Sequence, residues 1–205
     1  MLENILILMN QAINFIVQII LFSVVPLSWY IISRRKCRGF GEYIGIQRVE
    51  KNSYIGALGI TGLVYIFSVL VIMILKITQG GMVSNPLINI YHKGGIVFII
   101  SLILFGVQTG ISEEILFRGF IGKRLIKRYG FLRGNILQSL IFMFPHIMTF
   151  GKASLLECIL GMINASIMGF AFGYIMEKKS EGSIIPIIVC HAVVNMTSVL
   201  IVNIL

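Results

Sequence analysis

Long apolar stretches dominate this sequence and decide what it can fold into. About six segments approach or exceed the roughly 20 residues that an α-helix needs to cross the hydrocarbon layer of a membrane. Hydrophobic residues make up 57% of the 205 residues and charged residues only 12%, and the mean hydropathy is +0.95. Soluble domains of this length seldom have such a composition. The pattern therefore predicts an all-α, polytopic membrane helix bundle.

The expected transmembrane helices cover residues 4–33, 53–76, 95–122, 134–150, 153–177 and 183–204. Neither a repeat nor a low-complexity linker separates them, so we expect a single membrane-embedded domain over 1–205. The three cysteines, Cys37, Cys158 and Cys190, have neither the spacing of a metal site nor that of a disulfide framework. We expect them to be small apolar packing residues.

Lysine and arginine are distributed unevenly between the expected loops. Loops 34–51, 123–133 and 178–179 share one side and hold six, five and two of the 17 basic residues, whereas the other side holds three lysines. Because basic loops stay in the cytoplasm, we expect these loops to be cytoplasmic in the cell membrane, with both termini outside. The net charge of +9 is then loop charge and indicates no nucleic-acid partner. Loop 34–51 also interleaves aromatic and aliphatic residues with its charges, so we expect it to lie on the membrane surface.

Six polar residues fall inside the expected spans, where each costs several kcal/mol if it faces lipid: Glu113, Glu114, Arg118, His146, His191 and Asn195. Counted from the cytoplasmic basic residues at 1.5 Å per residue, Glu113, His146 and His191 lie about 15, 20 and 18 Å deep. All three are near the middle of a layer about 30 Å thick. Pro145 and Pro186 stand close by, and broken helices are tolerated in membranes where they line a cavity. We therefore expect an intramembrane polar cavity.

Spacing along each helix divides these residues by role. Glu114 and Arg118 are four residues apart with the acid first, which favours an ion pair on one helix face. Glu113 points about 100° away from that face and is left available as a general base. His191 and Asn195 are also four residues apart, and both can donate hydrogen bonds to a developing oxyanion.

Three motifs now stand on three separate spans: Glu113-Glu114-x-x-x-Arg118, Phe142-x-x-x-His146 and His191-x-x-x-Asn195. In this order they resemble the signature motifs of the CPBP intramembrane proteases. That family includes type II CAAX prenyl endopeptidases, lysostaphin resistance protein A-like proteins, and bacteriocin-processing or self-immunity proteins. The resemblance covers a motif-bearing core of about 95–200. It implies an endopeptidase that cleaves a membrane-associated peptide or protein, prenylated or carrying a leader.

Carried over by position, the resemblance assigns a role to each residue. Glu113 would be the general base that activates water, and His146 would help to orient that water. His191 and Asn195 would stabilise the tetrahedral oxyanion. The Glu114–Arg118 pair would hold the site together, and Phe142 would pack beside His146. We expect the substrate to approach through the helices near the basic loops.

Three alternatives remain at this point. The reaction needs no cofactor in the favoured mechanism, but Glu113, His146 and His191 could bind zinc; the chain has no HExxH motif, and Asn195 is a poor zinc ligand. The same fold could serve as a non-catalytic immunity or peptide-binding protein. A proton-coupled transporter using the same residues is disfavoured, because the sequence shows no inverted repeat.

Overall fold

Helices form the regular structure of the protein in the computed structural model, which describes residues 2–33, 39–78, 86–92, 95–149 and 153–204. The described residues contain no β-strand. In chain order the elements are α1 (Leu2–Ile32), α2 (Phe40–Ile44), α3 (Lys51–Thr78), α4 (Ile88–Tyr91), α5 (Gly95–Glu113), η1 (Glu114–Gly122), α6 (Lys123–Tyr129), α7 (Phe131–Met143), η2 (Phe144–Thr149), α8 (Leu155–Tyr174), η3 (Ile175–Lys179) and α9 (Ile185–Ile204). The predicted all-α membrane bundle is confirmed.

Five helices within the described residues are long and apolar enough to cross a membrane: Leu2–Ile32, Lys51–Thr78, Gly95–Tyr129, Leu155–Lys179 and Ile185–Ile204. The sixth expected span, 134–150, has a different form. Here α7 has 13 residues, about 20 Å at 1.5 Å per residue, and then tightens into the 3₁₀ segment η2. Pro145 lies in η2; it has no N–H to donate, and its ring collides with the carbonyl of an α-helical preceding turn. The proline therefore ends α7 within the bundle.

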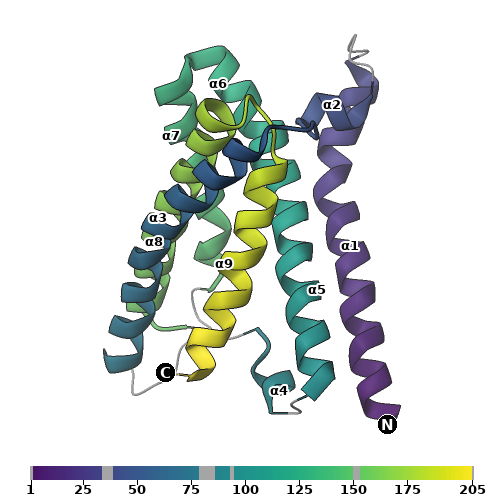
Figure 1. The fold of residues 1–205 in the computed structure, drawn as a ribbon, viewed down its shortest axis with the longest axis vertical. Coiled ribbons are helices and arrows are strands. Elements are labelled where there is room, and N and C mark those ends of the chain that lie inside the picture. Colours follow the sequence, from purple (N-terminus) through teal and green to yellow (C-terminus); the bar gives the residue numbers. More distant parts are fainter. Residues whose placement is uncertain (1, 34–38, 79–85, 93–94, 150–152, 205) are drawn as a thin grey trace.

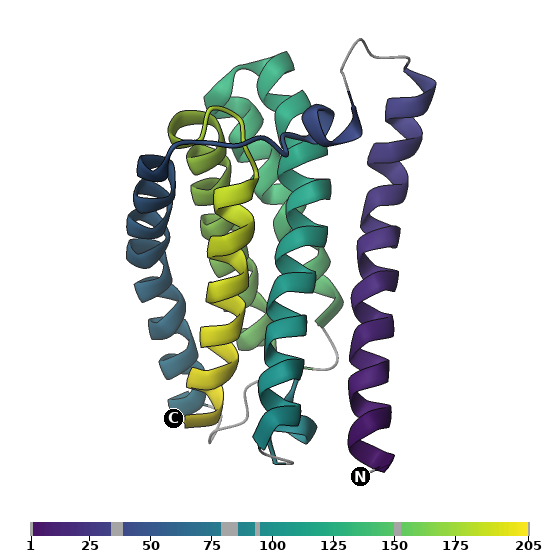
Figure 2. The same ribbon diagram turned by 45° about the vertical axis from the view of Figure 1, so that its right-hand side comes forward.

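The helices pack around α5 and α9, which lie side by side in the middle of the bundle (Figures 1 and 2). α1 packs against the outer side of α5, α3 packs against α8 and α9, and α7 packs against α8. Figure 1 shows both chain termini at one end of the bundle and α2 and α6 at the other. The described parts of the basic loops therefore share one end, opposite the termini, as the alternation of spans predicts.

At that end, which we call the basic end, hydrogen bonds join loop 34–51 to the residues just before α9. The Ile184 N–H donates to the Gly45 carbonyl at 2.9 Å, and Ser183 Oγ donates to the Gln47 carbonyl at 2.7 Å. Gly45 has a left-handed φ of 89°, and a Cβ atom there would press on the Gly182 carbonyl and the Lys123 side chain. Only glycine fits this crossing without strain.

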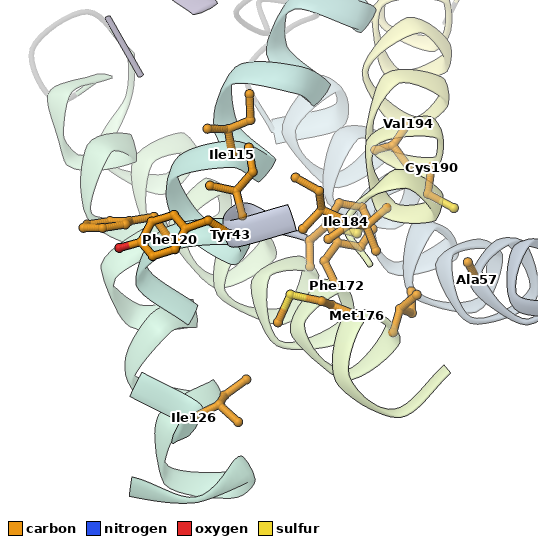
Figure 3. Packing of buried hydrophobic residues seen from close by; sticks show 14 residues of the cluster. Tyr43, Ala57, Ile115, Phe120, Ile126, Phe172, Met176, Ile184, Cys190 and Val194 are labelled. Carbon is orange, nitrogen blue, oxygen red and sulfur yellow. The ribbon is translucent and has the colours of Figure 1, made fainter. Parts of the chain in front are cut away.

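Helix α2 contributes to the core, which differs from the surface position expected for 34–51. Tyr43 and Ile44 are both buried, while residues 34–38 lie outside the described part of the chain. Both side chains belong to the main apolar core, ten residues of which are labelled in Figure 3. Six core residues have no solvent exposure: Ile44, Phe172, Ile175, Met176, Ile184 and Ile187. The core therefore fills the bundle toward the basic end.

Small residues let neighbouring helices approach closely, which is how helices associate in lipid. A Cβ atom at Gly169 of α8 would lie 3.1 Å from Ser139 of α7, and one at Gly110 of α5 would lie 2.8 Å from the Ile188 carbonyl of α9. A Cβ atom at Gly161 would meet nothing within 4 Å, because this residue lies on a cavity wall. Close packing accounts for Gly169 and Gly110, and not for Gly161.

Candidate active site

A cavity of about 480 Å³ lies inside the bundle, between α3, α5, α8, α9 and the α7–η2 segment. Its wall includes Glu113, His146, His191 and Asn195, together with Phe142. The depth estimates predicted that Glu113, His146 and His191 would meet, and the structure brings them to one cavity. Their catalytic roles remain predictions.

Glu114 lies behind this wall and connects two helices. Its Oε1 atom is 2.8 Å from Arg118 Nη1 and 2.7 Å from His191 Nδ1. The ion pair with Arg118 is the one that the spacing predicts, and both of its side chains are 0% exposed. The contact with His191, which reaches across from α9, was not predicted from the sequence. A carboxylate that pairs with Arg118 accepts hydrogen bonds, so the histidine tautomer that fits this contact has its proton on Nδ1 and turns Nε2 toward the cavity.

Glu113 is placed differently from its neighbour. Its side chain is 21% exposed, and its Oε2 atom lies 3.7 Å from Nε2 of His191. That separation exceeds a direct hydrogen bond, so the carboxylate keeps its acceptor capacity toward the cavity. Adjacent glutamates are thus divided between a fully buried ion pair and a cavity wall.

The backbone changes form at this division. η1 is a π-helical segment that begins immediately after Glu113, within the continuous helix Gly95–Tyr129. At its end the Lys123 N–H donates to the Arg118 carbonyl, five residues back. π-helical turns are rare and occur frequently at functional sites. Periodicity of the apolar residues does not reveal one, because the helix continues on both sides.

Aromatic rings enclose the charged groups. The Arg118 guanidinium carbon lies 3.9 Å from the centre of the Phe142 ring and 5.3 Å from that of Phe172. The Phe142 ring is also 5.9 Å from His146 and 6.1 Å from His191, and the Phe172 ring is 5.3 Å from His191. Rings at these distances stabilise a cation and restrict the imidazoles. Phe142 was expected to pack here; Phe172 was not identified from the sequence.

Uncharged polar side chains complete the wall. The Asn195 Nδ2 atom is buried and has no hydrogen-bond partner among the described residues, so it can donate to a bound group. Ser68 Oγ donates to Asn164 Oδ1 at 2.7 Å. Gln18 of α1 donates through Nε2 to Ser112 Oγ at 2.9 Å and also borders the cavity. A glutamine inside an apolar run is the signal that would have identified Gln18.

The cavity continues toward the end of the bundle that carries the termini. A second cavity of about 250 Å³ shares part of its wall with the first, including Ser68, Asn164 and Ser198. Its other wall residues include Leu75 near the end of α3 and Val202 near the end of α9. We call the two cavities together the cleft. Its direction differs from the expected approach near the basic loops, where the apolar core is packed instead.

The residues of the zinc alternative do not form a complete ligand set. Among the described residues, no group of three His, Cys, Asp or Glu side chains is placed to hold a metal ion. His191 bonds Glu114 through Nδ1 and keeps Nε2 toward the cavity, but His146 does not complete a group with Glu113 and His191. Cys158 and Cys190 are buried and are not joined in a disulfide, and Cys37 lies outside the described residues.

The bundle and its cleft define a polytopic membrane protein with a carboxylate and two imidazoles on the wall of an internal polar site. A family model described as type II CAAX prenyl endopeptidase Rce1-like matches residues 95–197, just over half of the chain and all three motifs. The chain belongs to this family of CAAX-type intramembrane proteases, as its motifs predict, and a protease of this kind acts on a peptide or protein in the membrane. Comparisons with curated proteins and with solved structures returned no match.

Proposed function

We propose that the protein is an intramembrane endopeptidase that uses Glu113, without a metal ion, to hydrolyse a peptide bond of a membrane-associated peptide or protein. One observation carries this proposal. Glu114 is fully buried between Arg118 and His191, whereas Glu113 faces the cavity with its acceptor oxygens available. A carboxylate in that position can take a proton from water.

The reaction begins with a water molecule held between Glu113 and His146. Glu113 removes one proton as the water oxygen bonds to the carbonyl carbon of the scissile peptide, whose oxygen becomes an oxyanion. Glu113 then passes the proton to the peptide nitrogen as the C–N bond breaks, which leaves a carboxylic acid and an amine. The base is thus restored, and no cofactor is consumed.

His191 and Asn195 supply the oxyanion site. This role uses the imidazolium form of His191, in which Nδ1 donates to Glu114 and Nε2 also carries a hydrogen. Nε2–H of His191 and Nδ2–H of Asn195 then both point at the developing negative charge. Removing one such donor typically costs a factor of about 10²–10³ in rate.

The proposed location is the cell membrane with the basic end in the cytoplasm. The support is the excess of Lys and Arg in loops 34–51, 123–133 and 178–179, because basic loops resist translocation. The packing of the described parts of these loops at one end of the bundle agrees with that orientation.

Glu113→Gln tests the mechanism, because the amide preserves shape but cannot accept a proton. We expect a loss of about 10²–10⁴ in cleavage rate, seen as accumulation of uncut precursors when membrane peptides are compared by proteomics between cells with wild-type and variant protein. Glu50→Gln is the matched control, since Glu50 is exposed at the basic end. Retained cleavage by purified Glu113→Gln protein refutes the mechanism. Activity lost to a chelator and restored by zinc would favour the metal-dependent alternative.

A further inference from the structure

The direction of the cleft bears on where the substrate comes from. From Glu113 the wall runs along Asn195 and Ser198 of α9 toward Val202, a path that follows α9 to its carboxyl end. Glu157, the third residue of α8, lies on the same outer part of the wall. Figure 1 shows these ends of α8 and α9 at the end of the bundle where the termini lie.

The opposite direction is filled with side chains. Phe172, Ile187 and Ile184 have no solvent exposure and belong to the core of Figure 3. Beyond them Ile44 and Met176 are also fully buried. A peptide or a water molecule that came from the basic end would have to displace this close-packed layer.

We propose that the substrate enters the cleft from the face opposite the basic end, so that the bond cleaved belongs to the translocated, non-cytoplasmic part of a membrane-anchored peptide or protein. The inference rests on the proposed proteolysis and on the proposed orientation of the basic loops. Water and the released fragment use the same path.

The chemistry of the wall fits an extended peptide segment. Ser68, Asn164, Asn195 and Ser198 offer uncharged hydrogen-bonding groups along the cleft, and Phe105 adds apolar surface. Such groups can bond the main-chain N–H and C=O of an extended chain. The segment at the bond is therefore extended and made of apolar or uncharged polar residues.

Ser198→Cys tests the direction of access with a probe that needs no knowledge of the substrate. The probe is a membrane-impermeant sulfonated maleimide, applied to intact spheroplasts and, separately, to inverted vesicles. The variant is made in Cys37→Ser protein, because Cys158 and Cys190 are buried, and that background alone serves as the blank. Lys127→Cys is the matched control, exposed at the basic end.

We expect Ser198→Cys to react about tenfold faster or more from outside, because a charged reagent does not cross the hydrocarbon layer. Lys127→Cys should show the opposite preference. The inference is overturned if Ser198→Cys reacts faster from the same side of the membrane as Lys127→Cys. It is also overturned if Lys127→Cys is labelled from outside. Absence of labelling from either side, while a small permeant maleimide reacts, also overturns it. Val202→Cys replaces Ser198→Cys if the latter fails to insert.

Labelling does not depend on turnover, so the same measurement is made in Glu113→Gln protein. If the protein proves inactive as a protease but Ser198→Cys is still labelled from outside, the proteolytic mechanism is refuted and the direction of access is supported. Conversely, labelling from the basic side with normal cleavage removes only the direction of access.

Discussion

Replacing Glu114 by glutamine removes the counterion of Arg118 while leaving the shape of the side chain almost unchanged. Both residues are 0% exposed, and they are joined at 2.8 Å through Nη1. The Nε and Nη2 atoms of Arg118 have no hydrogen-bond partner within the described residues. Glu114 is therefore the principal group that stabilises a charge held out of water, and the amide leaves that charge unbalanced.

The expected cost is large for a one-group change. Removing one partner of a buried pair typically costs about 3–5 kcal/mol, because the other charge stays buried. The bond from His191 Nδ1, at 2.7 Å, adds to the loss, although the glutamine oxygen can still accept it. Removing both charges together with Arg118→Met should recover about 2 kcal/mol or more, since paired buried residues are not additive.

Denaturant unfolding of the detergent-solubilised protein measures these terms as a double-mutant cycle. The four proteins are wild type, each single variant and the double variant, with Glu50→Gln as a surface control expected within about 0.5 kcal/mol of wild type. Two results would refute the reasoning that the pair is a coupled, buried charge unit. One is a double variant whose loss of unfolding free energy equals the sum of the losses of the two single variants, and the other is a Glu114→Gln protein as stable as the control.

Two further predictions concern helix packing. Gly110→Ala should lower the free energy of unfolding by about 1–3 kcal/mol, because the new methyl group presses on α9. Gly59→Ala is the control: a Cβ atom there meets nothing within 4 Å, so the variant should be neutral or stabilised by up to about 1 kcal/mol. Denaturant unfolding of the two variants side by side checks this. Gln18→Leu should weaken the association of α1 with α5 by about 0.6 kcal/mol and at most about 1.7 kcal/mol, the range for such interhelical bonds. Asn14→Leu, at an exposed position of the same helix, should leave this association unchanged in the same unfolding assay. Equal effects of the two variants would contradict the role of the Gln18–Ser112 bond.

The depth of a residue along its helix could be predicted from the sequence, whereas the rotation of each helix about its own axis could not. The length of each apolar run sets how far Glu113, His146 and His191 lie from the loops, and they do line one cavity. The ion pair of Glu114 with Arg118 is a local property of one helix and was also predicted. The contact of Glu114 with His191, 77 residues away, depends on how α5 and α9 are turned toward each other, which no span length records.

The direction of the cleft was missed for a related reason. Basic loops mark the side of the membrane on which they stay, but they do not say which end of the bundle is filled. That is decided by core volume: Ile44 and Ile184 come from loops or helix starts that looked polar or peripheral in the sequence, yet both are fully buried. Likewise, the chain before residue 90 carried no motif, although Gln18 and Ser68 from that part border the cavity.

The wide turn of η1 makes the number of residues in this stretch as consequential as their identity. A π-helical turn closes its hydrogen bond over five residues, as Lys123 does onto Arg118, and an α-helical turn closes over four. Deleting Leu116 would remove one residue from the wide turn and let the segment close as an α-helix, and it would shorten the spacing between Glu114 and Arg118 from four residues to three. The site would then lose its wide turn and the spacing of its ion pair with every motif residue still present in the sequence. Lipid-facing residues of this segment can be replaced, but its length cannot change by one residue.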